Sequence, residues 1–232
     1  VTLTLFSVFP TAPFTAKAEE AKLPAVGDKT RDFELKGLDG KSVKLSQFTK
    51  KGPVVLMVLR GYPGYQCPIC NRQVGQYITA AKKLQAANAT VLMIYPGPSE
   101  NLKARAEDFI TGKTLPENFH LLIDPDYSFT NAWQLRWDAP RETAYPSTFV
   151  IAQDQKIRFA KISKTHGDRA PVDDVLEALS NSSDSEADET RSSQSAAKIL
   201  ERVRRHAFQP LEKGFTKDAE LDRHGIADLA ND

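Results

Sequence analysis

The sequence predicts an α/β protein with a central mixed sheet flanked by helices. Short apolar runs that suit strands alternate along the chain with segments whose apolar residues recur at helical spacing. The first strand–helix–strand unit is expected to form a right-handed crossover. Of the 232 residues, 41% are hydrophobic and 26% are charged, which are ordinary values for a globular protein with one sizeable core.

The first half of the sheet is expected between residues 26 and 97. Residues 26–48, "VGDKTRDFELKGLDGKSVKLSQF", suggest two short strands, because Asp39-Gly40 favours a tight turn between them. Residues 52–60, "GPVVLMVLR", form an apolar run that suits a strand buried on both faces of a parallel sheet. A second such run is "TVLMIYPG", residues 90–97. Between these two runs a helix is predicted by the apolar positions Val74, Tyr77, Ile78, Ala81 and Leu84.

The second half continues the alternation. Ser99 is expected to cap a helix whose apolar face is Leu102, Ala106, Phe109 and Ile110. "FHLLIDP" reads as a third strand, and "YSFTNAWQL" reads as a short helix. "STFVIAQDQKIRF" predicts an antiparallel hairpin that turns at Asp154–Gln155. Pro171 is expected near the first turn of a final helix that carries Val172, Val175, Leu176 and Leu179.

Composition divides the chain into four predicted segments. Residues 1–22 resemble a leader, because the apolar stretch Val1–Phe9 is followed by "AKA" at 16–18, a small-x-small pattern typical of signal-peptide cleavage. This predicts an exported, periplasmic or secreted protein. Residues 23–180 form the predicted folded domain. Residues 181–195 are serine-rich and acidic and read as a linker, and 196–232 as a disordered or helical tail with a short helix that presents Ile199 and Val203.

Charge and hydropathy exclude two classes of partner. The net charge of +1 gives no electrostatic reason to expect nucleic acid or an anionic membrane. No segment approaches the ~18 uncharged apolar residues that a membrane-spanning helix requires, so no integral membrane segment is predicted.

Both cysteines of the chain lie in "RGYPGYQCPICNRQVGQY", with two residues between Cys67 and Cys70. A metal site requires about four ligands, and the chain has no second cysteine pair and four scattered histidines, so no metal is expected. A purely structural cross-link is disfavoured, because closing so small a ring stabilises a fold by only ~2 kcal/mol. Redox chemistry is the favoured reading.

The predicted position of these cysteines makes them reactive. A buried strand leads directly into the C-x-x-C, and a helix follows it, so both sulfurs are expected at a helix N-terminus. The unpaired amides and the helix dipole there stabilise a thiolate. Pro68 suits the first turn because it has no N–H to leave unbonded. Arg60 and Arg72 are candidates for cations that lower a thiol pKa further.

The motifs resemble the thioredoxin-fold superfamily in its peroxiredoxin-like branch, the alkyl hydroperoxide reductase/thiol-specific antioxidant or redoxin type. The resemblance covers roughly 26–179 and implies a thioredoxin-like fold with an N-terminal strand extension and no cofactor. In "PGYQCPIC" the peroxiredoxin motif P-x-x-x-T/S-x-x-C places the peroxidatic cysteine at Cys70 and replaces the Thr or Ser by Cys67. The thioredoxin pattern instead makes Cys67 the exposed attacking thiol and Cys70 the resolving one.

A second region of the resemblance bears on substrate binding. In "AYPSTF", Pro146 stands where peroxiredoxins carry an arginine that polarises peroxide. A proline there resembles the cis-proline loop of thioredoxins, which implies a cis Tyr145–Pro146 bond and backbone beside Tyr145 that is free to pair with a partner. Tyr145, Pro146 and Tyr65 are therefore the expected substrate-binding residues.

Three functions follow in order of preference. The first is a thiol–disulfide oxidoreductase, or antioxidant redoxin, that uses the Cys67–Cys70 dithiol with a protein disulfide, a dithiol partner or a reductant such as a thioredoxin. The second is a thiol-dependent peroxidase in which Cys70 reacts with peroxide and Cys67 resolves. The third is a non-enzymatic scaffold whose C-terminal tail binds a partner. The sequence leaves open the direction of electron flow, the reduction potential and the oligomeric state.

Overall fold

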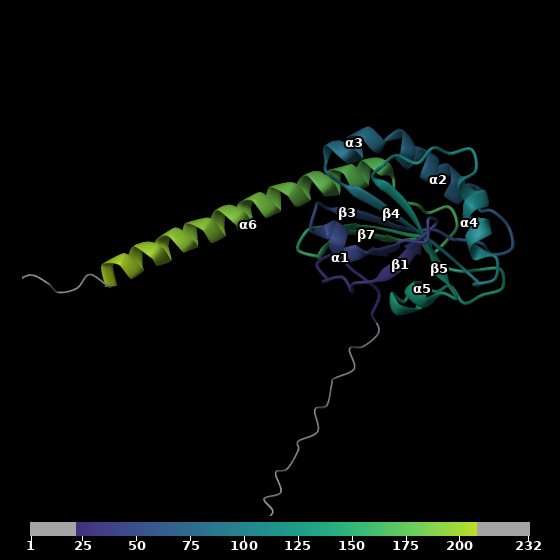
Figure 1. Cartoon of the computed structure of the whole chain (residues 1–232), viewed down its shortest axis with the longest axis horizontal. Helices are drawn as coiled ribbons and strands as arrows, with labels where there is room; N and C mark the ends of the chain where they lie inside the picture. Colours follow the sequence, from purple (N-terminus) through teal and green to yellow (C-terminus); the bar gives the residue numbers. More distant parts are fainter. Residues whose placement is uncertain (1–21, 208–232) are drawn as a thin grey trace, which may run out of the picture. The chain divides into compact units, whose positions relative to one another are not determined.

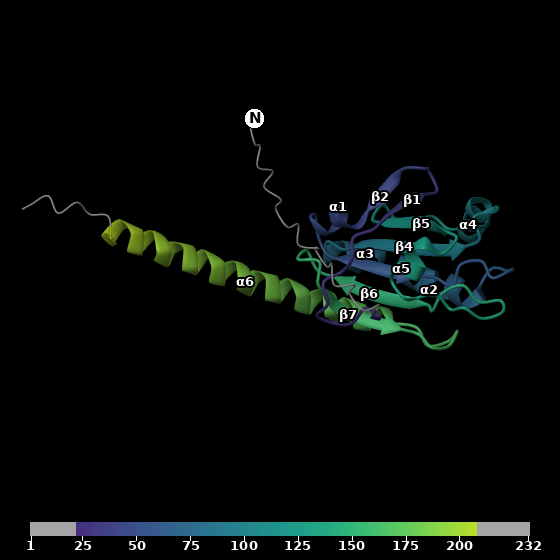
Figure 2. The same ribbon diagram turned by 90° about the horizontal axis from the view of Figure 1, so that it is seen from below.

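The structure is a computed structural model that describes residues 22–207, and for 183–193, 202–203 and 205–207 it describes the backbone alone. Seven strands form one mixed sheet in the order β2-β1-β5-β4-β3-β6-β7. Figure 2 shows the sheet with β1 near one end and β7 at the other. The strands are β1 (Glu34–Gly37), β2 (Ser42–Lys44), β3 (Val54–Val58), β4 (Thr90–Gly97), β5 (Phe119–Pro125), β6 (Ser147–Ile151) and β7 (Ile157–Ile162). The predicted mixed sheet and all seven predicted strands are confirmed.

The centre of the sheet is its most buried part. β3 pairs in parallel with β4 and antiparallel with β6, and every residue of β3 and β6 is buried. Continuous apolar runs are what a strand covered on both faces requires. β1 and β2 are shorter and pair antiparallel at the edge of the sheet away from β7. The residues of β1 alternate between exposed and buried, and those of β2 are exposed or partly exposed.

Helices cover both faces of this sheet. They are α1 (Leu45–Thr49), α2 (Pro68–Thr79), α3 (Ala81–Ala86), α4 (Leu102–Ile110), α5 (Ser128–Ala132) and α6 (Val172–Ala207). One core cluster joins α2, α3, α4 and the start of α6 to one face of the sheet, and a second joins α1 and α5 to the other. In Figure 1, α2 and α3 lie on one side of the strands and α5 on the other.

Two local predictions about helices are wrong. Ser99 does not cap α4; the N-cap is Asn101, whose backbone is left-handed with φ 57° and whose side chain makes no capping bond. Asparagine tolerates this conformation better than most residues. The helix predicted as one element after the cysteines is two, α2 and α3, separated at Ala80.

The last helix is longer than the sequence analysis predicts. α6 is helical through 181–195, the residues assigned to a linker, and the segment 172–207 contains neither glycine nor proline to interrupt it. The chain divides into two compact units, Val1–Asp184 and Ser185–Asp232. In the second unit Ile199 and Leu200 are exposed. The predicted leader, apart from residue 22, and the tail beyond Ala207 lie outside the described residues, so the four-segment organisation stays a prediction.

Candidate active site

The two cysteines lie where a buried strand gives way to a helix. After β3 ends at Val58, the chain reaches Cys67, which is the N-cap residue of α2 and has an extended backbone. Pro68 is the first residue of the helix. The Cys67 Sγ accepts a hydrogen bond from the Cys70 backbone N–H over 3.4 Å. The predicted placement of the dithiol at a helix N-terminus is confirmed.

Neither sulfur is exposed, which corrects one expectation. Cys67 is only 2% exposed and Cys70 only 1% exposed, and both are reduced. They belong to the core cluster that also contains Val74, Tyr77 and Tyr95. The expectation that Cys67 is an exposed attacking thiol is therefore wrong, because both sulfurs pack in the core between α2 and the sheet.

The pair ionises unequally. A hydrogen bond from the Cys70 side chain, aided by backbone N–H groups at the start of α2, lowers the pKa of Cys67 to about 5. The same side-chain contact, together with burial, raises the pKa of Cys70 well above its ordinary value. These opposite directions make Cys67 the more acidic thiol of the pair and Cys70 the less acidic one. A thiolate is the form of cysteine that attacks an electrophile.

Arg169, a cation that the sequence analysis missed, lies beside the dithiol. This residue lies between β7 and α6, and its Nη2 is 3.6 Å from the Cys70 Sγ. A second nitrogen, Nη1, donates to the Gln73 side chain over 3.1 Å. The positive charge of Arg169 lowers the pKa of both Cys67 and Cys70. A lone arginine about 100 positions away in the chain carries no sequence signal of this contact.

Arg60 acts on the dithiol through its backbone and not through its side chain. Its N–H donates to the Cys70 Sγ over 3.4 Å. Its guanidinium, 3% exposed, forms a two-pronged ion pair with Glu142, with Nε–Oε2 2.7 Å and Nη2–Oε1 3.0 Å. The guanidinium also donates to the Arg141 carbonyl and the Tyr65 hydroxyl. Burial opposes ionisation of Glu142, but hydrogen bonds from Arg60 and His166 outweigh it and lower the pKa of this carboxyl.

Two further predicted residues lie at the surface near the site. Arg72 is exposed on α2, and the contacts that shift the thiol pKa values come from other residues. Tyr65, 46% exposed, lies over the buried Arg60, with the guanidinium carbon 5.2 Å from its ring centre.

The expected partner-binding backbone is already occupied. The Tyr145 N–H donates to the Leu135 carbonyl over 2.8 Å, and the Pro146 carbonyl accepts the Ser163 N–H over 2.9 Å. The Tyr145–Pro146 peptide bond is trans. The predicted cis bond and free backbone are therefore wrong, because the chain before β6 pairs with 135–137 and with the end of β7. The assignment of Tyr145, Pro146 and Tyr65 to substrate binding stays a prediction.

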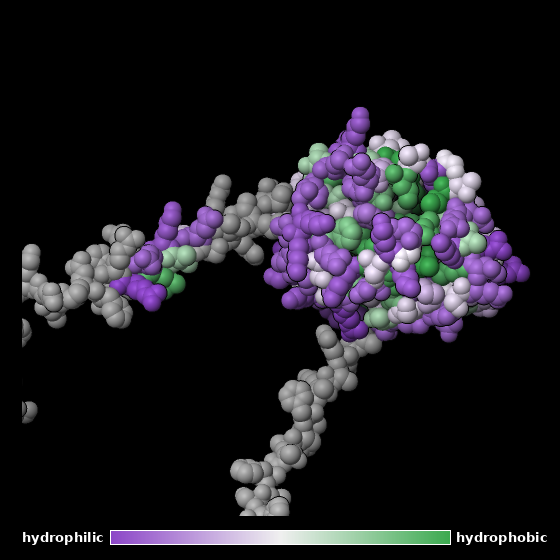
Figure 3. All heavy atoms as spheres, viewed as in Figure 1, coloured by the Kyte–Doolittle hydropathy of each residue, from purple (hydrophilic) through white to green (hydrophobic). Residues whose placement is uncertain are grey.

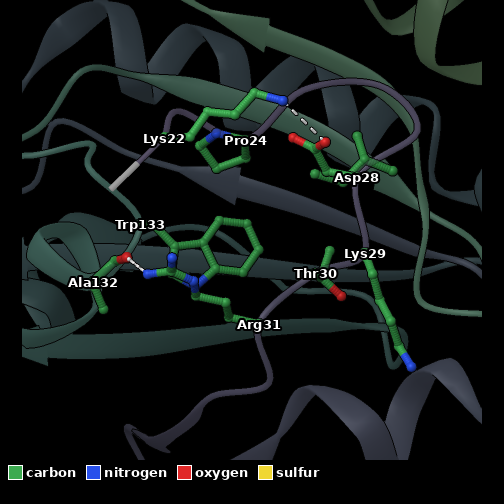
Figure 4. A pocket seen from close by; sticks show the side chains of 9 residues that line it. Lys22, Pro24, Asp28, Lys29, Thr30, Arg31, Ala132 and Trp133 are labelled. Carbon is green, nitrogen blue, oxygen red and sulfur yellow. Dashed lines mark hydrogen bonds and ion pairs between the residues drawn. The ribbon is translucent and has the colours of Figure 1, made fainter. Parts of the chain in front are cut away.

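Two cavities differ in their relation to the dithiol. One, of about 310 Å³, is lined by Tyr62, Pro98, Glu100, Asn101, Leu102 and Arg105. Tyr62 and Leu102 also pack in the core cluster that contains the cysteines, so this cavity adjoins their side of the sheet. The other, of about 300 Å³, is shown in Figure 4, where Lys22 pairs with Asp28 and Arg31 donates to the Ala132 carbonyl beside Trp133. Trp133 belongs to the core cluster on the opposite face.

The face shown in Figure 3 is mainly hydrophilic with small hydrophobic patches. Among the side chains that the structure describes, no three from His, Cys, Asp or Glu gather as a metal ion would require. No helix in the described part of the chain is long and apolar enough to cross a membrane.

Comparison with known proteins places this geometry in context. The sequence model of the AhpC/TSA family matches residues 26–160. Peroxiredoxin Bcp of Bacillus subtilis is 27% identical over 57% of this chain and 81% of its own, and the chloroplastic peroxiredoxin Q of Suaeda salsa is 27% identical over 72% and 71%. Among solved structures, the peroxidoxin BcpB of Mycobacterium tuberculosis superposes with a TM-score of 0.54 at 25% identity, covering 68% of this chain and 97% of that one. The thioredoxin-like fold implied by the sequence motifs is confirmed.

These relatives also correct the predicted location. One is a chloroplastic peroxiredoxin Q and another is the bacterial peroxiredoxin Bcp, and such relatives point away from an exported protein. The apolar stretch Val1–Phe9 that prompted the prediction of export lies outside the described residues. An apolar run followed by small residues is a weak indication of a signal peptide, because it rests on residue composition alone.

Proposed function

Because the chain belongs to the AhpC/TSA family, we propose that it reduces hydroperoxides by cycling Cys67 and Cys70 between a dithiol and a disulfide. The protein is a thiol-dependent oxidoreductase with an antioxidant redox function. The proposal concerns its substrate and the division of labour between the two sulfurs.

The burial of an ionised dithiol carries this proposal. Cys67 and Cys70 are 2% and 1% exposed, yet the pKa of Cys67 is lowered to about 5. A peroxide is a small molecule and needs only a small opening beside the sulfurs. A disulfide on another protein is a much larger reactant, and the backbone at Tyr145 that would receive that protein is already hydrogen-bonded. These features favour a small oxidant as the first substrate.

The proposed reaction balances in two steps. The Cys67 thiolate attacks one oxygen of a hydroperoxide ROOH, the O–O bond breaks, and the departing RO⁻ takes a proton to become ROH. Cys67 is then a sulfenic acid. The Cys70 thiol attacks its sulfur, a disulfide forms and water leaves. The sum is dithiol plus ROOH giving disulfide, ROH and H₂O.

The disulfide must then be reduced by exchange with an external dithiol. A protein reductant such as a thioredoxin supplies the two electrons, and each exchange step passes through a mixed disulfide. Since both sulfurs are covered, we expect the segment 61–67 to move before the reductant can reach Cys67.

A second assignment of the sulfurs is favoured by a specific observation. The family motif P-x-x-x-T/S-x-x-C places the peroxide-reactive cysteine at Cys70, and this sulfur, unlike Cys67, contacts both Arg169 and the Arg60 N–H. In that case Cys70 becomes the sulfenic acid and Cys67 resolves it.

Two single variants decide between the assignments. Reduced Cys67→Ser and Cys70→Ser proteins are mixed with hydrogen peroxide in the presence of dimedone, and the adduct is located by mass spectrometry. We expect fast sulfenic acid formation on Cys67 in the Cys70→Ser protein and little on Cys70 in the other. The reverse pattern supports Cys70 as the attacking thiol.

The same measurements can also refute the whole proposal. If neither variant forms a sulfenic acid and the wild-type protein keeps both thiols during peroxide treatment, peroxide is not the substrate. Rapid oxidation of the same two thiols by a protein disulfide would then favour thiol–disulfide exchange, the first function predicted from the sequence.

A further inference from the structure

The loop between β7 and α6, residues 163–171, brings a cation to the dithiol by a route that includes His166. Arg169 of this loop has three hydrogen-bonding nitrogens, and each has a different acceptor. Nη2 reaches the Cys70 Sγ at 3.6 Å, and Nη1 reaches the Gln73 Oε1 at 3.1 Å. Nε donates to the carbonyl oxygen of His166 over 2.8 Å.

His166 is itself held from the other side. Its Nε2 lies 2.9 Å from the Glu142 Oε1, and its ring packs against Trp137 with 5.2 Å between ring centres. Nε2 can donate this hydrogen bond in the protonated imidazole or in the neutral tautomer that carries hydrogen there, so the contact does not require a charged histidine. Glu142 is fixed in turn by its two-pronged pair with the buried Arg60.

These contacts close a ring around the reactive sulfurs. From Cys70 the ring runs through the backbone and side chain of Arg60 to Glu142, His166 and Arg169, and so back to Cys70. Three loops that are far apart in the sequence therefore meet at one carboxylate. The loop is also attached at its two ends, where the Ser163 N–H donates to the Pro146 carbonyl over 2.9 Å and the Tyr77 hydroxyl donates to the Ala170 carbonyl over 3.3 Å. Neither of these two bonds involves the Arg169 side chain.

We infer that His166 is a positioning residue for the dithiol, because its side chain is held by Glu142 while its carbonyl oxygen holds the guanidinium of Arg169 against Cys70. The inference rests on the proposed role of Cys67 and Cys70 as the reacting pair. It assigns His166 no contact with peroxide and no proton transfer. Its effect on the thiols passes entirely through Arg169.

A double-mutant cycle tests this route. His166→Ala, Arg169→Met and the double variant are prepared in reduced form, and the rate at which iodoacetamide alkylates Cys67 is measured from pH 4 to pH 8. We expect His166→Ala and Arg169→Met each to move the midpoint upward, and a rise of one pKa unit lowers the thiolate fraction below the midpoint about tenfold. In the Arg169→Met background, His166→Ala should add no further shift, because the group it positions is absent.

Conservative and matched variants separate positioning from general destabilisation. His166→Gln keeps a side-chain N–H that can bond Glu142 and is expected to restore most of the wild-type profile. His120→Ala, on the opposite face of the sheet beside Phe48, should leave the profile unchanged. Should His166→Ala fail to fold, His166→Leu retains packing against Trp137 and takes its place in the cycle.

Two results would overturn the inference. One is that His166→Ala raises the midpoint of Cys67 alkylation equally in the wild-type and Arg169→Met backgrounds. The other is that His166→Ala leaves this midpoint unchanged in both backgrounds. Because alkylation needs no peroxide, these results are independent of the peroxide assay. A dithiol that ignores peroxide but shows the expected cycle would refute the proposed substrate and leave the role of His166 intact.

Discussion

At the residue scale, the chemistry of the site depends on which neighbours each sulfur has. Cys67 is the N-cap of α2, and its Sγ accepts a hydrogen bond from the Cys70 backbone N–H. The Cys70 Sγ accepts a hydrogen bond from the Arg60 backbone N–H and lies near the Arg169 guanidinium. The residue types and the spacing of the C-x-x-C made the dithiol and its helix N-terminus predictable from the sequence. Arg169 was not predictable, because only the folded chain brings residue 169 to residue 70.

The lowered pKa of Cys67 predicts how its reactivity depends on pH. Since only the thiolate reacts, alkylation of Cys67 by iodoacetamide should be near its plateau at pH 7 and fall about tenfold per pH unit below a midpoint of about 5. Peptide mapping by mass spectrometry after brief labelling measures the rate at Cys67 itself. A midpoint near the ordinary value of 9.0 would contradict the ionised site.

The buried Arg60–Glu142 pair predicts a large stability effect. Glu142→Leu leaves a guanidinium that is only 3% exposed without its counter-ion, so we expect a loss of about 3–5 kcal/mol in the free energy of unfolding by urea. Replacing both residues, Arg60→Met with Glu142→Leu, should cost less than Glu142→Leu alone.

The exposed pair Lys103–Glu107 on α4 is the matched control. Glu107→Ala should change the unfolding free energy by less than about 1 kcal/mol, because solvent screens that pair. If Glu142→Leu and Glu107→Ala lowered the free energy of unfolding equally, burial would not determine how much the Arg60–Glu142 pair stabilises the fold.

At the element scale, helix boundaries were the least predictable feature of the fold. The apolar runs of β3, β4 and β6 predict buried strands, and the structure has these strands where they were predicted. The sequence did not predict three features: the start of α4 at a left-handed Asn101, the break at Ala80 and the separate helix α1. Such boundaries depend on single backbone conformations and on packing, which hydrophobic periodicity does not record.

The start of α5 illustrates a boundary set by one buried side chain. Asp124, at the end of β5, is fully buried, and its carboxylate accepts the N–H groups of Phe129 at 2.7 Å and Thr130 at 3.1 Å and the Ser128 hydroxyl at 3.0 Å. These are the N–H groups that a helix leaves without partners at its first turn.

Replacing this carboxylate should therefore destabilise the whole domain. Asp124→Ala leaves two backbone N–H groups without their acceptor, and we expect a loss of roughly 2–4 kcal/mol in unfolding free energy. Asp124→Asn keeps one oxygen and should lose less. Urea unfolding monitored by the fluorescence of the tryptophans measures both, and identical stability of all three proteins would refute the capping role.

At the scale of the whole molecule, the unit Val1–Asp184 contains the sheet and every residue of the candidate site. The family match also ends before Asp184, at residue 160. The sequence suggested a third function in which the tail binds a partner while the domain only supports it. A site complete within the first unit favours catalysis in that unit.

Shortening the chain tests this division. A protein that ends at Asp184 should keep wild-type peroxide consumption within about twofold, because no residue of the site is removed. Peroxide loss coupled to a thioredoxin system measures the rate, and a melting curve of the same protein shows whether the domain is intact. A folded but inactive protein would show that residues beyond 184 take part in the reaction.

The sequence by itself determined the layered α/β fold, its strands and the presence of a redox dithiol at the start of a helix. Each of these depends on short-range patterns: apolar runs, helical spacing, and two cysteines beside a proline. Only the tertiary structure decided that both sulfurs are covered, that the Tyr145 backbone is occupied, and that Arg169 and the Arg60–Glu142–His166 contacts surround Cys70. The physical reason is that burial and charge at the site come from loops that are distant in the chain and meet only when the sheet has formed.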